Sequence, residues 1–237
     1  FPSVILYSLS DLLVPEMSRS RVRGRRERIV FLTDKCLRLS MLFAAAMAGL
    51  CFLLGDSLGQ LLFQSAGAGV YIRIFSPLIL ILYLDAITDG ILKGLSQQIH
   101  SVRYNTFTSL LDVLLLFLLL PSRGIGGYLA AYTISHSINF FLSLRRLMIV
   151  TGYLPRFHAT IKGVLCCLCA LLFLSLAPEG NRIPDILARS GGFLLLYLPL
   201  IRLTGALERE DVRWLKKVSD KPGRVQDPGH GRPAAGV

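Results

Sequence analysis

Residues 39–63, LSMLFAAAMAGLCFLLGDSLGQLLF, form an apolar stretch with one charged residue, Asp56. A helix of about 20 apolar residues, rising 1.5 Å per residue, matches a bilayer core of about 30 Å. Five further stretches of this kind are separated by short polar segments, at residues 70–92, 104–120, 125–144, 163–178 and 187–205. The pattern predicts an all-α, polytopic transmembrane helix bundle with six full spans.

Composition and charge agree with a membrane protein. The chain is 53% hydrophobic and 17% charged, more apolar than one soluble core of 237 residues could bury. A net charge of +11 would suggest nucleic-acid binding in a soluble protein. Here every second loop is basic, and only four of the 26 lysines and arginines lie on the other side: Arg73, Arg123, Arg182 and Arg189. The positive-inside rule therefore predicts a multi-pass protein of the bacterial cytoplasmic membrane, with a cytoplasmic C-terminus and no nucleic-acid partner.

The first residues are expected to be the inner end of an incomplete span. Residues 1–14 are apolar, and Pro15 is expected to end their helix. An arginine-rich loop at residues 18–28 follows, whereas a signal peptide carries its positive charge before the apolar region. The chain is therefore expected to be the C-terminal part of a longer protein.

Two short segments follow the last span. Residues 206–218, ALEREDVRWLKKV, suit an amphipathic helix at the inner interface, with Trp214 at headgroup depth. An ordinary solvated helix end is the alternative. Residues 219–237 are rich in Pro, Gly and Arg, without an apolar pattern, and are predicted to be a disordered cytoplasmic tail.

Ionisable residues inside predicted spans are candidate functional groups, because they are costly to place in a bilayer. Asp85, Asp89 and Lys93 lie four residues apart and share one helix face, where Asp89 and Lys93 can pair. Asp85 lies deeper, without an opposite charge on its own helix. It could line a cavity and bind a coupling cation or proton, or it could be a buried carboxylate satisfied by a neighbouring helix.

Two other spans carry polar stripes. Asn105, Ser109 and Asp112 form one of them, which could line a cavity or could hydrogen-bond to another helix. His136 and Asn139 share a face of the span at 125–144 with Thr133 and Ser143. Because no second histidine or carboxylate is near them in sequence, structural packing is the favoured reading of this pair.

Arg73 lies near the outer start of its span, where it could reach the interface or meet a phosphate at a cavity mouth. Soluble-enzyme motifs are absent from the sequence. Gly124–Gly127 lacks the lysine of a phosphate-binding loop and indicates an outer turn with close helix packing. The five cysteines show no zinc-site spacing. We therefore expect no catalytic residue, metal or cofactor.

Several short segments, in order along the chain, resemble those of one transporter family. They are LVPEMSR at 13–19, GILKGLSQQ at 90–98, VRYN at 102–105, GIGGY at 124–128 and SINFFLS at 137–143. The chain resembles the stage V sporulation protein B-like polysaccharide flippases. Their superfamily also contains the lipid II flippases and the multidrug and toxin extruders.

The resemblance implies a fourteen-helix transporter, with two six-helix lobes and a final helix pair, that works by alternating access. Residues 1–155 would be part of the second lobe (the end of one helix plus four helices), and residues 156–205 the C-terminal pair. The implied cargo is a lipid-linked oligosaccharide or peptidoglycan precursor, used in spore or cell-wall formation. In lipid II flippases the important cavity arginines lie largely in the first lobe, so no cargo-binding residue is assigned here.

The chain could also be a truncated gene product without transport activity, and two alternative functions remain open. One is a cation-coupled multidrug extruder of the same superfamily. The other is a membrane-embedded glycosyltransferase or polymerase of wall synthesis, although every predicted outer loop is short and no catalytic acids are evident.

Overall fold

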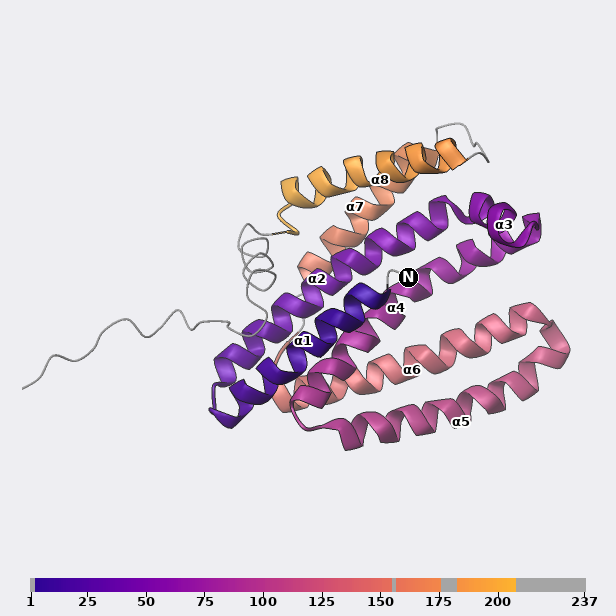
Figure 1. Ribbon diagram of the computed structural model, residues 1–237. Helices are drawn as coiled ribbons and strands as arrows, with labels where there is room; N and C mark the ends of the chain where they lie inside the picture. Colours follow the sequence, from indigo (N-terminus) through magenta and orange to yellow (C-terminus); the bar gives the residue numbers. More distant parts are fainter. Residues whose placement is uncertain (1–2, 155–156, 176–182, 208–237) are drawn as a thin grey trace, which may run out of the picture.

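The computed structural model describes residues 3–154, 157–175 and 183–207, which form α-helices and no β-strand (Figure 1). The helices are α1 Ser3–Val22, α2 Arg26–Leu53, α3 Gly55–Phe63, α4 Ala66–Gly94, α5 Gln98–Arg123, α6 Ile125–Thr151, α7 Phe157–Ser175 and α8 Ile183–Leu203. This confirms the predicted all-α membrane helix bundle. The expected interfacial helix and tail fall almost entirely beyond residue 207, outside the described residues.

Helix α4 lies at the centre of the bundle. It packs against α1, α2, α3 and α6, whereas α5 lies at the edge and packs chiefly against α6 (Figure 1). Helices α7 and α8 pack against each other and against α2. Because only Gly124 separates α5 from α6, these helices must run antiparallel as neighbours.

The number of full spans differs from the six predicted. In the described part of the chain, four helices are long and apolar enough to cross a membrane: α2, α5 and most of α4 and α8. Helix α6 carries serine, threonine, histidine and asparagine side chains, which lower its mean hydropathy. The apolar part of α7, Ile161–Ser175, is short.

The stretch at 39–63 was predicted to be one helix, but the structure has two helices there. Helix α2 ends at Leu53, and α3 begins at Gly55 in a new direction (Figure 1). Asp56, in the first turn of α3, forms an ion pair of 2.6 Å with Arg73 of α4. Gly59 lies so close to α4 that a Cβ atom there would be 2.8 Å from the Cα of Gly69. The hydropathy of the sequence does not indicate these contacts between α3 and α4.

Pro15 does not end its helix, contrary to the prediction, and other prolines also lie inside helices. Helix α1 continues through Pro15 to Val22, and Leu13 and Met17 on either side of the proline are both buried. Helix α5 passes Pro121 and ends at Arg123. Inside α4, where Pro77 cannot donate to the carbonyl of Arg73, the hydroxyl of Ser76 donates to that oxygen at 2.8 Å. Membrane helices tolerate proline when such groups satisfy the freed carbonyl.

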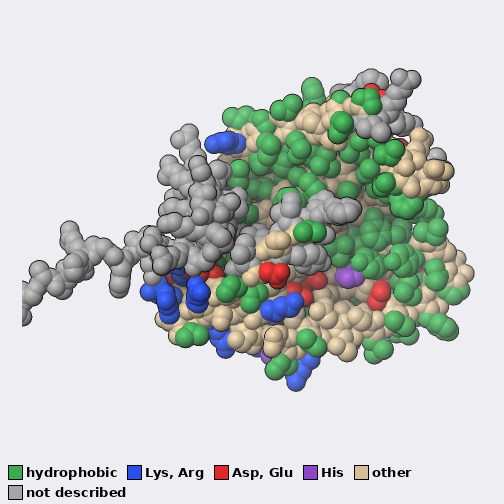
Figure 2. All heavy atoms as spheres, viewed as in Figure 1, with side chains coloured by type: hydrophobic (Ala, Val, Ile, Leu, Met, Phe, Trp, Pro, Cys, Tyr) green, Lys and Arg blue, Asp and Glu red, His purple; other side chains and the backbone are tan. Residues whose placement is uncertain are grey.

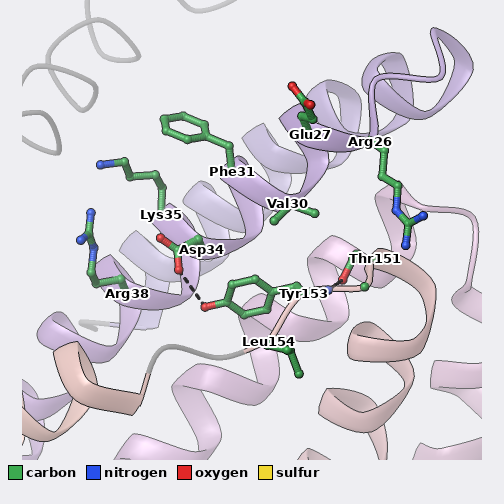
Figure 3. Close-up of a pocket in the computed structure, with 11 residues that line it drawn as sticks. Arg26, Glu27, Val30, Phe31, Asp34, Lys35, Arg38, Thr151, Tyr153 and Leu154 are labelled. Carbon is green, nitrogen blue, oxygen red and sulfur yellow. Dashed lines mark hydrogen bonds between the residues drawn. The ribbon is translucent and has the colours of Figure 1, made fainter.

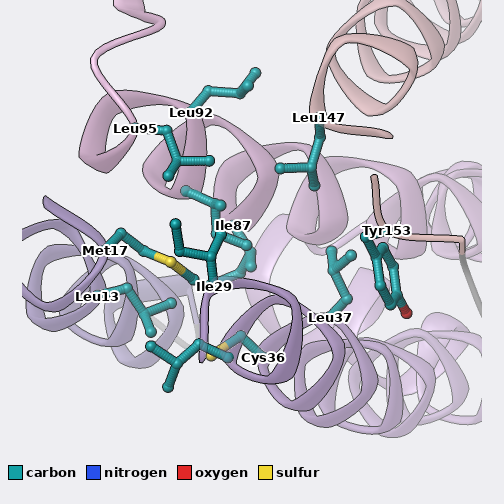
Figure 4. Close-up of a cluster of buried hydrophobic side chains, with 12 residues drawn as sticks. Leu13, Met17, Ile29, Cys36, Leu37, Ile87, Leu92, Leu95, Leu147 and Tyr153 are labelled. Carbon is teal, nitrogen blue, oxygen red and sulfur yellow. The ribbon is translucent and has the colours of Figure 1, made fainter. Parts of the chain in front are cut away.

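Two apolar clusters hold the bundle together. The first lies among α1, α2, α4 and α6 and includes Met17, Cys36, Ile91 and Leu147 (Figure 4). The second joins α2 to α7 and α8, where the stacked rings of Phe193 and Tyr197 lie 5.7 Å apart. The hydroxyl of Tyr197 donates to the carbonyl of Leu42 at 2.9 Å, so this contact also joins α8 to α2.

One end of the bundle, here called the basic end, holds the α1–α2 turn, the α4–α5 turn and the end of α6 (Figure 1). Lysine and arginine side chains gather there (Figure 2). The guanidinium of Arg28 pairs with Glu16 at 2.6 Å, and that of Arg146 donates to Gln97 at 2.7 Å. Residues 18–28 were predicted to be a basic loop, but they are mostly helical. Only a short turn separates α1, which ends at Val22, from α2, which begins at Arg26.

Candidate functional site

A row of hydrogen-bonded polar side chains runs from the basic end into the bundle, between α4, α5 and α6. We call it the polar ladder and define it as Asp85, Asp89, Ser101, Asn105, Thr108, Asp112, Ser135, Asn139 and Ser143. Along each helix its members recur every three or four residues, which places them on one face. Three apolar helices therefore share one polar seam.

The rung nearest the basic end is centred on Asp89. Its Oδ1 accepts a hydrogen bond from the hydroxyl of Ser101 at 2.6 Å and one from Ser143 at 3.4 Å. Asn105 donates to Oδ2 at 3.4 Å. Within the described residues, these donors from α5 and α6 bind Asp89 in place of Lys93, the partner that sequence suggested.

The middle rung joins all three helices. The Nδ2 of Asn139 donates to Oδ2 of Asp85 at 2.8 Å, and the hydroxyl of Thr108 donates to Oδ1 of Asn139 at 3.3 Å. Asn139 is only 4% exposed. The other carboxylate oxygen of Asp85, Oδ1, is buried and has no hydrogen-bond partner among the described residues. A buried acceptor without a donor costs free energy, so this oxygen is available to a proton or a cation.

The deepest rung links α5 to α6. The hydroxyl of Ser135 donates to Oδ1 of Asp112 at 2.8 Å. One residue further on, the ring of His136 packs against the ring of Tyr132, with centroids 4.1 Å apart. Asp112 therefore makes an interhelical hydrogen bond, which was one of the two roles that the sequence left open for it. The ring of His136 makes a packing contact.

Arg73 is not part of the polar ladder. It lies near the opposite end of α4, paired with Asp56, and its side chain packs on Gly55. The structure thus brings Asp85, Asp89 and Asn139 together in one seam. Asp112 lies in the same seam, with His136 beside it. Arg73 is separate from all of these residues.

Sequence reasoning missed three ladder residues: Ser101, Thr108 and Ser135. The signal was the spacing, because Ser101, Asn105, Thr108 and Asp112 recur at intervals of four, three and four residues. Ser109, which was assigned to the stripe instead, is exposed. Serine and threonine hydroxyls are common in membrane helices, so composition alone did not single these residues out.

The ladder offers carboxylate, amide and hydroxyl groups. Among the described residues, no group of three or more His, Cys, Asp or Glu side chains is arranged to hold a metal ion. The ladder's chemistry is therefore that of oxygen ligands and proton carriers, in a setting otherwise made of apolar helices.

A separate apolar groove lies between α2, α4 and α7, with a volume of about 460 Å³. Small side chains, Ala45, Ala48 and Gly49 of α2, leave this space open, and Leu168 and Leu172 of α7 face it. Its lining is almost wholly apolar, which suits a hydrocarbon chain.

Comparison with known proteins gives one distant similarity. No family model matches the chain. The chain is similar to stage V sporulation protein B of Bacillus subtilis (strain 168). Identity is 28% over 128 residues, which is 53% of this chain but 25% of the relative. The matched part thus spans about a quarter of the relative's length. Together with the apolar helices, the similarity indicates a membrane protein.

Replacing Asn139 with leucine is expected to lower stability by about 1–3 kcal/mol, because it removes the amide that donates to the carboxylate of Asp85. Thermal unfolding in detergent measures the effect. The control is Asn105→Leu, which removes an exposed amide whose bond to Asp89 is longer, at 3.4 Å. Equal losses in the two variants would contradict the role given to Asn139.

Proposed function

We propose that the protein containing this chain is a flippase that moves lipid-linked oligosaccharides or peptidoglycan precursors across the bacterial cytoplasmic membrane by alternating access. The observation that carries the proposal is the polar ladder, which places hydrogen-bonded carboxylates inside a bundle of apolar helices. Ionisable groups at that depth mark ion or substrate pathways. The similarity to stage V sporulation protein B supports a role in spore or cell-wall formation.

In this proposal the ladder serves coupling, and cargo binding lies elsewhere. Its charged members are all acidic, so an anionic pyrophosphate would be repelled from it, whereas a proton or a monovalent cation would be attracted. Asp85 is the central group, because one of its oxygens is buried without a donor. Asp89 and Asp112 would then set the electrostatic field above and below it.

The hydrocarbon tail of the cargo would stay in or beside the bilayer during transport. The groove between α2, α4 and α7 is apolar and could hold one chain of such a tail. The polar head would pass through a cavity between this lobe and a second one. Residues 1–155 would form part of one lobe, and residues 156–205 an appended helix pair.

The orientation follows from charge. The basic end would face the cytoplasm and so would the C-terminus, because lysine and arginine collect on the cytoplasmic side of membrane proteins. The partners are then membrane lipids, the lipid-linked saccharide and the coupling cation or proton.

The test is a transport assay on the full-length protein reconstituted into liposomes. A fluorescent lipid-linked oligosaccharide in the inner leaflet should become accessible to an external quencher, at a rate above that of empty liposomes. A proton or sodium gradient should change that rate. Efflux of cationic drugs with no movement of the lipid-linked probe would overturn the proposal in favour of a multidrug extruder.

A further inference from the structure

A pocket of about 740 Å³ opens at the basic end, between the first part of α2 and the segment that follows α6 (Figure 3). It lies apart from the polar ladder and from the apolar groove, with which it shares no lining residue. We propose that this pocket binds the phosphate headgroup of an anionic phospholipid in the adjacent membrane leaflet.

The charges of the pocket favour an anion. Arg26, Lys35 and Arg38 line it, together with the carboxylates of Glu27 and Asp34. The hydroxyl of Tyr153 donates to Oδ1 of Asp34 at 3.0 Å, which holds that carboxylate against the segment after α6 (Figure 3). The three cations outnumber the two carboxylates, so the lining carries a net positive charge. Cationic side chains near a membrane surface attract anionic lipid.

The cations are held in place by the fold. Lys35 is only 4% exposed, and its ammonium lies 5.5 Å from the centroid of the Phe31 ring. The Arg26 guanidinium lies against Gly152, where a Cβ atom would be 2.5 Å from Nη2. Gly152 has a φ of 69°, a left-handed conformation that ends α6 and lets Arg26 approach. Figure 3 places Arg26 at one end of the pocket and Lys35 with Arg38 at the other.

The rim of the pocket is apolar. Phe31 is 48% exposed and Leu154 is 80% exposed, and both line the pocket. Large apolar side chains next to fixed cations match the boundary between lipid headgroups and acyl chains, where aromatic and basic residues act as anchors. A free phosphate ion would use the cations but not this rim. For this reason the pocket fits a phospholipid better than a soluble anion.

The experiment uses purified, delipidated full-length protein in detergent, with phosphatidylglycerol as the probe and phosphatidylcholine as the neutral comparison. Bound lipid is counted by native mass spectrometry, and binding is followed by the rise in melting temperature. We expect phosphatidylglycerol to bind the parent protein in preference to phosphatidylcholine. The Arg26→Gln/Arg38→Gln variant should need roughly tenfold more phosphatidylglycerol for the same effect.

The matched control is Arg23→Gln/Arg103→Gln, which removes the same charge from exposed positions at the basic end but outside the pocket. It should bind phosphatidylglycerol like the parent protein. Equal weakening in both double variants would show general attraction to the basic end and overturn the proposal. So would an equal rise in melting temperature with inorganic phosphate alone.

A single variant, Arg26→Gln, protects the test against misfolding, because Arg26 is exposed and belongs to neither apolar cluster. It should show part of the weakening and keep the parent's melting temperature in phosphatidylcholine. Unchanged binding of phosphatidylglycerol in this variant would also count against the proposal. None of these measurements depends on transport, so a failure here is distinct from failure of the flippase proposal.

Discussion

Replacing Asp85 with asparagine is expected to reduce transport by the full-length protein about tenfold or more, without preventing its insertion into the membrane. Asparagine has nearly the shape of aspartate and can still meet Asn139 across the α4–α6 contact. It cannot take up a proton or neutralise a cation, so the coupling free energy between ion and cargo, typically 1–3 kcal/mol, is lost. Initial transport rates in liposomes, with and without an ion gradient, measure the effect.

The control for Asp85 is Asp185→Asn, which makes the same substitution at a half-buried position in the first turn of α8, outside the polar ladder and the pocket at the basic end. Its transport rate should match that of the parent protein. If Asp85→Asn transports normally while its response to the gradient is unchanged, then Asp85 is a structural carboxylate, satisfied by a neighbouring helix.

Replacing Gly127 with alanine is expected to lower the free energy of unfolding by about 1–3 kcal/mol. Gly127 packs directly on the backbone of α5, and a Cβ atom there would be 2.6 Å from the carbonyl carbon of Leu119. A backbone cannot move aside as a flexible side chain can. Helix α5 would therefore have to shift away from α6, and the bond between Asp112 and Ser135 would lengthen with it.

The adjacent glycine provides a matched control. A Cβ atom at Gly126 would meet nothing within 4 Å, and alanine has the better helix propensity, so Gly126→Ala should be neutral or slightly stabilising. Melting temperatures of both variants, measured in the same detergent, decide the matter. Similar values for the two would mean that α5 and α6 are not closely packed at this position.

Helices were easier to predict than their ends. The apolar stretches were long, and a bilayer leaves a chain few alternatives to the helix, so their existence followed from composition. The ends did not follow, because Pro15 and Pro121 are accommodated inside helices and the break at Leu54 depends on contacts between α3 and α4. Of the glycines at 124–127, where an outer turn with close packing was predicted, Gly124 forms the turn with a φ of 55° and Gly127 packs on α5, whereas a Cβ atom at Gly126 would meet nothing within 4 Å.

Most residues of the polar ladder could be recognised from sequence, and three of them could not. Asp85, Asp89 and Asp112 stand out because a carboxylate inside an apolar helix is rare. The ladder residues Ser101, Thr108 and Ser135 do not stand out, because hydroxyl side chains carry no such penalty. Arg73 was expected to reach the interface or to meet a phosphate at a cavity mouth, and the structure pairs it with Asp56, a residue of the split first stretch.

The sequence by itself determined that the chain is an all-α membrane helix bundle and that its lysine and arginine residues gather at one end. Hydropathy and charge are sums over neighbouring residues, so they can be read along the chain without knowing how it folds. Only the tertiary structure decided which polar groups meet. Asn139 donates to Asp85 across 54 residues of sequence, and Tyr153 donates to Asp34 across 119. Such pairings depend on the register between packed helices, which steric fit between distant side chains and glycines sets.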